Sequence, residues 1–213
     1  MNNTNAALNI LTMPEPSSPI TDCDSYFESS RRVLAQLPYS DIERVADKLY
    51  QAYEEGRRVF LFGNGGSAAL ASHFACDLGK GTTVPGNHQK RFKVLSLTDN
   101  VALLTAWAND TSYEQIFAQQ LQNFIESDDI AFGISGSGRS PNILLALQAA
   151  RKAGAFNVGL TGFQGGGMKG LCDLCIVIPS DNMQVIEDFQ LAVTHALFTI
   201  VRNKIIFGNR VIR

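Results

Sequence analysis

The stretch VFLFGNGGS, residues 59–67, decides the fold class. Four apolar residues lead into a glycine-rich turn, and a helical spacing of apolar positions begins at Ser67. The stretch AFGISGSGRS, residues 131–140, repeats this order. Strands that are apolar throughout are typical of parallel sheets covered by helices on both faces, and strand–turn–helix units are what build such sheets. The two stretches therefore predict an α/β fold.

The rest of the chain continues this alternation. Strands are expected at residues 59–62, 94–97, 130–134, 156–160 and 175–178. Helices are expected at residues 26–37, 40–55, 67–78, 100–107, 113–125, 141–153 and 183–204. Strands that alternate with helices predict a doubly wound, mostly parallel five-stranded sheet flanked by helices.

The ends of some elements carry their own signals. Ser40 is expected to cap the helix 40–55, with Glu43 as its capping-box partner and Gly56 as its stop. Residues 1–20 contain three prolines and show no periodicity, which predicts a loose N-terminal arm. The length of 213 residues fits one domain, expected over residues 21–213.

Composition excludes several classes of protein. Apolar residues make up 45% of the chain and charged residues 18%, which is typical of a globular protein. The formal net charge of −2, without a basic block, argues against a nucleic-acid partner. The sequence has neither the ~20-residue apolar run that spans a bilayer nor a basic segment leading into an apolar core. We therefore expect a cytoplasmic protein without a membrane partner.

The cysteines leave an alternative open. Four are present, and Cys172 and Cys175 form a C-x-x-C pair that could serve zinc or redox chemistry. A zinc ribbon needs a second pair, and a thioredoxin-like pair opens a helix, whereas residues 171–178 have the pattern of a strand. A structural role as small buried side chains is the favoured interpretation.

The two glycine-rich turns favour an anion. Both fall where a parallel α/β sheet binds ligands, at the carboxyl ends of its strands, as does a third polar segment at residues 161–167. Glycine lets the backbone approach a ligand, a helix start offers unpaired N–H groups, and serine adds hydroxyl donors. The alternative is a tight turn whose serine merely caps the helix. Neither turn matches the nucleotide-binding patterns G-x-x-x-x-G-K-[ST] and G-x-G-x-x-G.

Four ionisable residues are candidates for chemistry. His73 and Asp77 are four positions apart on one helix and could bind a metal, exchange protons or form a surface ion pair. Glu187 and His195 lie eight positions apart on the last helix, about 80° around its axis, so a single small site needs another element to reach them. His195 could equally be a buried histidine of the core.

Five motifs follow one another along the chain: Gly63-Asn64-Gly65-Gly66-Ser67-Ala68-Ala69, His73-Phe74-Ala75, Asn109-Asp110, Gly133-Ile134-Ser135 with Ser137-Gly138 and Ser140, and Leu160-Thr161-Gly162 with Gly165-Gly166. In these motifs the sequence resembles the sugar isomerase (SIS) domain of the phosphoheptose isomerases. The resemblance runs from about residue 26 to residue 205.

The resemblance implies an aldose–ketose isomerase that converts sedoheptulose 7-phosphate to D-glycero-D-manno-heptose 7-phosphate through an enediol. It further implies a homotetramer with active sites at subunit interfaces and a Zn²⁺ ion. The phosphate would be held by Ser67, Ser135, Ser137 and Ser140, and the sugar by Asn64, Gly65, Gly66, Asn109 and Asp110. Gly136 and Glu187 would be further substrate-binding positions. The metal ligands would be His73, Asp77, Glu187 and His195, with Asp77 and His195 also acting as catalytic acid and base.

The chain departs from the family at two of these positions. The family usually has Glu where this chain has Asp77, and Gln where it has Glu187. The shorter Asp77 side chain is expected to withdraw its carboxylate by roughly an ångström. Two alternatives stay open beside the enzyme. One is a non-catalytic SIS adaptor that binds the bacterial replication initiator, and the other is a sugar-phosphate sensor.

Overall fold

The computed structural model describes residues 19–83 and 90–208, so nearly all of the arm expected at 1–20 lies outside the described residues. A five-stranded sheet has the order β2-β1-β3-β4-β5, and every neighbouring pair is parallel. The strands are β1 (Arg58–Gly63), β2 (Lys93–Ser96), β3 (Ile130–Ser135), β4 (Phe156–Thr161) and β5 (Leu174–Val177). The α/β architecture expected from the sequence is confirmed.

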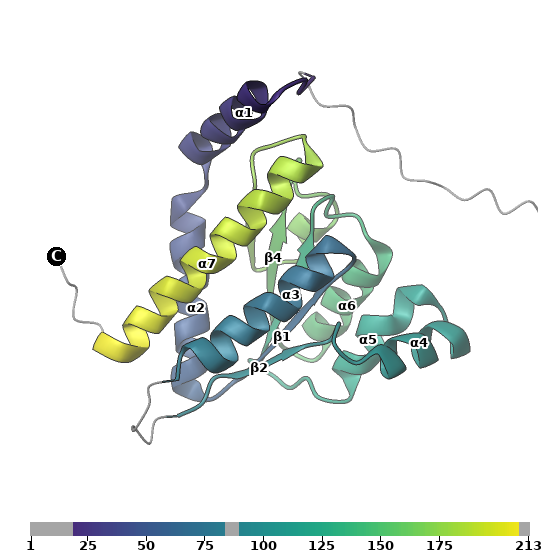
Figure 1. Cartoon of the computed structure of the whole chain (residues 1–213). Coiled ribbons are helices and arrows are strands. Elements are labelled where there is room, and N and C mark those ends of the chain that lie inside the picture. The colour runs from purple at the N-terminus through teal and green to yellow at the C-terminus, as the bar shows by residue number, and fades with distance from the viewer. Residues whose placement is uncertain (1–18, 84–89, 209–213) are drawn as a thin grey trace, which may run out of the picture.

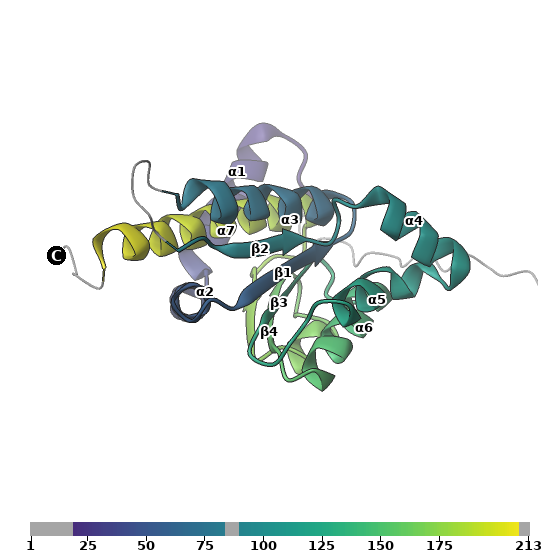
Figure 2. The ribbon, with the colours of Figure 1, turned by 90° about the horizontal axis from the view of Figure 1, so that it is seen from below.

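Helices cover both faces of the sheet (Figures 1 and 2). On one face lie α2 (Tyr39–Glu55), α3 (Gly66–Cys76) and α7 (Met183–Phe207), with α1 (Cys23–Gln36) beside the start of α7. On the other face lie α5 (Ile116–Gln122) and α6 (Pro141–Lys152), with α4 (Val101–Asp110) at the periphery next to α5. Short turns are η1 (Asp77–Gly81), η2 (Tyr113–Gln115) and η3 (Met168–Gly170).

Each face of the sheet has its own hydrophobic core, because alternate residues of a strand point to opposite sides. Leu61 and Phe132 pack with α2, α3 and α7, while Phe60 and Phe62 pack with α5 and α6. The central strand β3 is buried along its whole length. These two cores fix the directions of the turns that follow β1 and β3.

Several expected helix ends are wrong. The α2 helix begins at Tyr39 after Pro38, so Ser40 lies inside it and no Ser40–Glu43 capping box forms in this described segment. The carbonyl of Pro38 instead accepts the first N–H groups of the helix, those of Asp41 and Ile42. The helix expected at 113–125 is a 3₁₀ turn followed by α5. Gly56 does end α2, in the left-handed conformation with φ of 69°.

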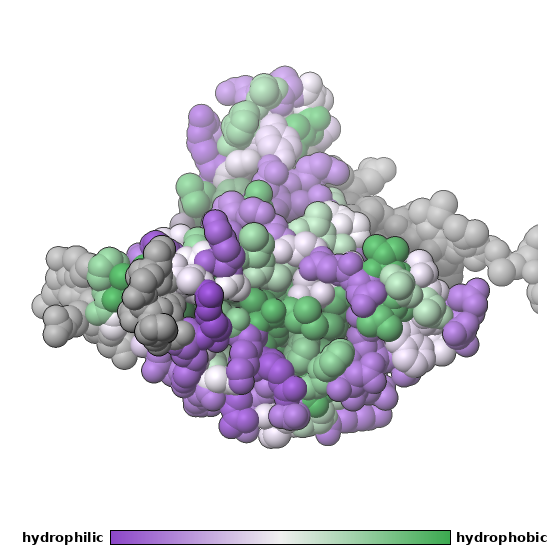
Figure 3. All heavy atoms as spheres, turned by 60° about the horizontal axis from the view of Figure 1, so that its bottom comes forward, coloured by the Kyte–Doolittle hydropathy of each residue, from purple (hydrophilic) through white to green (hydrophobic). Residues whose placement is uncertain are grey.

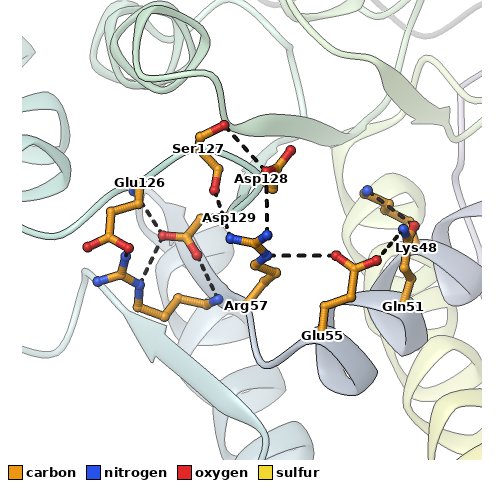
Figure 4. A network of polar contacts seen from close by, with 9 residues as sticks. Lys48, Gln51, Glu55, Arg57, Glu126, Ser127, Asp128 and Asp129 are labelled. Carbon is orange, nitrogen blue, oxygen red and sulfur yellow. Dashed lines mark hydrogen bonds and ion pairs between the residues drawn. The ribbon is translucent and has the colours of Figure 1, made fainter.

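A network of charges closes the edge of the sheet where β1 and β3 begin (Figure 4). The side chain of Asp129 is buried and accepts three hydrogen bonds: from the backbone N–H of Arg58 at 2.8 Å, from Arg58 Nε at 2.9 Å, and from the backbone N–H of Glu126 at 2.9 Å. This edge lies opposite the carboxyl ends of the strands. Its role is therefore to hold β1 and β3 in register.

Replacing Asp129 with alanine is expected to lower the free energy of unfolding by about 2–4 kcal/mol, because it leaves the backbone N–H groups of Arg58 and Glu126 without their acceptor and removes one of the two carboxylates that face the Arg58 guanidinium. Glu126→Ala is the matched control. Glu126 also pairs with Arg58, at 2.6 Å, but its side chain is 75% exposed, so a loss below about 1 kcal/mol is expected. Urea unfolding of the two variants measures the difference. Equal losses would contradict the assigned role of Asp129.

The free edge of β2 is the most apolar part of the surface seen in Figure 3, where green side chains gather between polar ones. A shallow groove along this strand is lined by Val94, Leu95 and Phe124, and the last two are nearly half exposed.

Within residues 19–83 and 90–208, no helix has the length and apolar character needed to cross a membrane.

Candidate active site

The first glycine-rich turn connects β1 to α3 at the carboxyl edge of the sheet. Gly65, just before the helix, has a positive φ of 54°, a backbone angle that favours glycine. A Cβ on Gly63 would lie 2.6 Å from the carbonyl oxygen of Ser67, so only glycine fits there. Ser67 follows inside the first turn of α3 and is buried. The turn is tight, but Ser67 does not cap α3. The alternative of a purely structural turn with a capping serine therefore does not describe it.

Two residues that the sequence did not single out hold Asn64. The amide groups of Asn64 and Asn142 hydrogen bond to each other, at 2.9 and 2.8 Å, and the Tyr113 hydroxyl donates to Asn64 Oδ1 at 3.0 Å. Tyr113 follows closely on Asn109 and Asp110, which end α4, are exposed and bond to each other at 2.8 Å. Proximity in sequence to that pair was the only signal that could have indicated Tyr113.

The second glycine-rich turn connects β3 to α6. The hydroxyl of Ser135 is buried, accepts the N–H of Gly138 at 3.2 Å and lies 3.4 Å from the hydroxyl of Ser140. Ser140 is the residue before α6, yet within the described residues its side chain makes no capping hydrogen bond. The Ser140 hydroxyl is therefore available to a ligand, and Gly136 and Ser137 lie in the same turn.

The third polar segment supports the second turn. The N–H of Gly162 donates to the carbonyl of Gly136 at 2.9 Å, and the N–H of Met168 donates to the carbonyl of Gly138 at 3.1 Å. A Cβ on Gly138 would lie 2.3 Å from the carbonyl oxygen of Gly165. The backbones are thus in direct contact, and the shape of the second turn depends on the segment that follows β4.

Three of the four candidate ionisable residues converge. The Nε2 atoms of His73 and His195 are 2.9 Å apart, and Asp77 Oδ2 lies 3.4 Å from the first and 3.9 Å from the second. The two imidazoles are about half exposed, whereas the Asp77 side chain is 22% exposed. His195 is therefore not a core histidine, and α3 is the other element that a site at His195 on α7 requires.

Asp77 lies where the helix type changes, and its N–H still donates to the carbonyl of His73, as in an α-helix. The α3 helix ends at Cys76, and the chain continues as a π-helical turn that begins at Asp77. Such turns are rare and occur frequently at functional sites. The sequence pattern predicted an unbroken helix to residue 78, so it did not reveal that Asp77 stands at this junction.

The cluster has the chemistry of a metal site. Among the described residues, His73, Asp77 and His195 form the one group whose ligand atoms lie close enough together, all within 4.8 Å. Asp77 Oδ2 is buried and has no hydrogen-bond partner in the described part of the chain, so a cation would satisfy it. Two imidazole nitrogens and a carboxylate oxygen are a set that zinc commonly takes in catalytic sites.

Glu187 lies next to this group but not within it. Its Oε1 is 3.2 Å from the position of a Cβ on Gly66, so it faces the first glycine turn. A pocket of about 370 Å³ joins the two places and is lined by Gly66, Ala69, Leu70, His73, Glu187, Asp188, Gln190 and Leu191. The hydroxyl of Tyr26 donates to Asp188 at 2.5 Å, and burial together with this carboxylate raises the pKa of Tyr26 to about 12.

Comparisons with known proteins agree with this arrangement. The family model described as SIS domain matches residues 25–162. A phosphoheptose isomerase of Clostridium acetobutylicum is 34% identical over 188 residues, 88% of this chain and 94% of that protein. A phosphoheptose isomerase of Aneurinibacillus thermoaerophilus is 39% identical over 176 residues, 79% of this chain and 83% of that protein. The structure of a phosphoheptose isomerase from Francisella tularensis superimposes with a TM-score of 0.78 at 32% identity, over 85% of this chain and 96% of that one. The chain therefore belongs to the SIS-domain family, among its phosphosugar isomerases.

Proposed function

We propose that this isomerase converts sedoheptulose 7-phosphate to D-glycero-D-manno-heptose 7-phosphate through an enediol. The observation that carries the proposal is the convergence of His73, Asp77 and His195 beside a pocket that reaches the first glycine turn. The relatives named for phosphoheptose isomerisation support the choice of a seven-carbon sugar.

The second turn is the proposed phosphate site. Ser135, Ser137 and Ser140 bring three hydroxyl groups to the start of α6, where backbone N–H groups and the helix dipole favour an anion. Ser67 offers a further hydroxyl from the first turn. Binding energy gained at the phosphate holds the reacting carbons in place without taking part in bond breaking.

The sugar is proposed to contact the first turn and its neighbours. Asn64, whose amide is fixed by Asn142 and Tyr113, would meet sugar hydroxyls together with the backbone of Gly65 and Gly66. Asn109 and Asp110 stand at the exposed end of α4, and Glu187 stands across the pocket.

Asp77 is the proposed base. Its Oδ2 faces the imidazole pair, which leaves Oδ1 to move a proton between C1 and C2 of the substrate. His195, half exposed at the same place, would exchange a proton with the sugar oxygen. Retention of both imidazoles and of the carboxylate favours an enzyme over a non-catalytic adaptor or a sensor.

His73, Asp77 and His195 would hold Zn²⁺, with Glu187 at the adjoining wall of the pocket. A bound zinc ion supplies stabilisation of negative charge on the enediol oxygens. We also propose a homotetramer with the sites at subunit interfaces. Both imidazoles are open to a neighbouring subunit, and α1 presents Phe27 and Leu34, two turns apart on one face, with more than half of each side chain exposed.

A single assay tests the function. The purified chain is incubated with sedoheptulose 7-phosphate, and the heptose phosphate is followed by NMR, with metal analysis of the same preparation. We expect product and about one zinc per chain, with activity lost after dialysis against a chelator and restored by Zn²⁺. Absence of product at every metal loading, in protein that still binds phosphate, would favour the adaptor or the sensor instead.

A further inference from the structure

Two cysteines meet on the inner side of the β4–β5 pair. Cys175 lies on β5 directly opposite Gly159 of β4, and Cys172 lies in the turn that leads into β5. The Sγ atoms of Cys172 and Cys175 are 2.8 and 3.1 Å from the position that a Cβ on Gly159 would occupy. Both sulfur atoms therefore lie against Gly159, and the space that its missing side chain leaves lets them lie next to each other.

The two thiols are chemically unequal. A hydrogen bond from the Cys172 thiol to the Cys175 sulfur, opposed by burial, lowers the pKa of Cys175, while the same bond and burial raise the pKa of Cys172. Lys169 adds a further lowering effect on Cys175. Both residues are only partly buried, and Cys172 packs at the margin of the hydrophobic core. A nucleophilic sulfur beside a protonated one is the arrangement of a reactive dithiol.

The pair is connected to the second glycine turn by a short path through the backbone. The N–H of Cys172 donates to the carbonyl of Met168 at 3.1 Å, and the N–H of Met168 donates to the carbonyl of Gly138 at 3.1 Å. The Met168 side chain is fully buried, and its Cε lies 3.3 Å from the Cβ positions on both Gly133 and Gly159. Two backbone hydrogen bonds through Met168 therefore connect Cys172 to the turn that carries Ser135 and Ser140.

We propose that Cys172 and Cys175 form a redox site, which a hydroperoxide converts to a reversible disulfide and which thereby weakens the second turn as an anion site. The Cys175 thiolate attacks the terminal oxygen of the hydroperoxide and the O–O bond breaks, which forms a sulfenic acid and releases an alkoxide, or hydroxide when the oxidant is hydrogen peroxide. The sulfur of Cys172 then attacks the Cys175 sulfur, its proton leaves with the sulfenic oxygen as water, and the disulfide closes. The peroxide gains two electrons and the two sulfurs lose two. A dithiol reductant reverses the change by thiol–disulfide exchange.

The disulfide draws the sulfurs from hydrogen-bond contact to a bond of about 2 Å. Cys175 is held in β5 by its pairing with β4, whereas Cys172 lies in the turn before the strand, so we expect the turn to take up the movement. Since that turn is hydrogen bonded through Met168 to Gly138, we expect a several-fold lower affinity for phosphate in the oxidised protein. This consequence rests on the proposed role of the second turn, whereas the disulfide itself does not.

The experiment uses the full chain and a Cys23→Ser/Cys76→Ser variant, which keeps only the proposed pair. After treatment with hydrogen peroxide, we expect a mass loss of about 2 Da, a peptide that links Cys172 to Cys175, and reversal by dithiothreitol. In Cys172→Ser, the sulfenic acid at Cys175 should persist and be trapped by dimedone. In Cys175→Ser, Cys172 should stay unmodified at the same peroxide concentration. No linked peptide, or equal trapping at both cysteines, would overturn the proposal.

The expected loss of phosphate affinity is tested with inorganic phosphate. Calorimetry measures its affinity for the reduced and for the oxidised form of the Cys23→Ser/Cys76→Ser variant. Affinity that falls on oxidation and returns on reduction supports the coupling, and equal affinity of the two forms overturns it. If the reduced protein binds no phosphate, the proposed role of the second turn fails, while the mass measurement still decides whether the redox site exists.

Discussion

Asp77→Asn is expected to lower kcat about 10²–10⁴-fold with little change in the affinity for inorganic phosphate. The amide keeps the size of the side chain and its place at the start of the π-helical turn, but it cannot accept the substrate proton. The carboxylate is 3.4 Å from His73 Nε2 and buried at Oδ2, so the substitution also removes the negative charge that faces both imidazoles. Steady-state kinetics on sedoheptulose 7-phosphate, with phosphate as the competing ligand, measures both quantities.

Glu187→Gln is the matched comparison for Asp77→Asn. It makes the same chemical change at a carboxylate that lines the same pocket but lies outside the His73–Asp77–His195 group. We expect less than about a tenfold loss of kcat, since Glu187 moves no proton in the proposed reaction. A larger effect at Glu187 than at Asp77 would show that the base has been assigned to the wrong carboxylate.

Ser140→Ala is expected to raise KM about 10–100-fold while kcat changes little. The hydroxyl would donate to the phosphate, and a hydrogen bond to a charged group contributes about 1.5–3 kcal/mol. Because the Ser140 side chain does not cap α6 in the described structure, its removal should leave the melting temperature within about 2 °C. Kinetics with a thermal melt on the same sample separates binding from stability.

Asn182→Ala is the control for capping. The Asn182 side chain accepts the N–H of Val185 at 3.1 Å at the start of α7, so its removal should cost about 1 kcal/mol of stability. If Ser140→Ala destabilises the protein as much as Asn182→Ala and leaves KM unchanged, the serine is structural and the phosphate lies elsewhere.

The sheet was predictable because its signal is local. Each strand is a short apolar run, and glycine and serine residues in the sequence indicate the turns after β1 and β3. The start of α2 could not be predicted in this way. Ser40 and Glu43 satisfy the capping pattern, but the helix begins two residues earlier, with Pro38 as the residue before its first turn. A rigid proline ring sets the local backbone there, and a side-chain pattern does not reveal which of two neighbouring starts is lower in free energy.

The site was predictable in its chemistry and less so in its geometry. His73, Asp77 and His195 were selected by residue type, but their meeting point depends on how α7 crosses α3. The shorter Asp77 side chain still brings its Oδ2 within 4 Å of both imidazoles, and only the packing of α7 against α3 puts the second imidazole there. Asn142 and Tyr113 were missed because they support Asn64 from other elements, and no spacing in the sequence records such contacts.

The most direct test of the central claim, proton transfer at Asp77, is isomerisation of sedoheptulose 7-phosphate in D₂O by the unmodified chain. An enediol formed by a carboxylate that exchanges with solvent predicts deuterium at C2 of the heptose phosphate, seen by NMR as loss of the H2 signal. It also predicts that Asp77→Asn incorporates deuterium at a rate lowered in parallel with kcat. Product formed without deuterium, or label that enters Asp77→Asn at the unmodified rate, would contradict it.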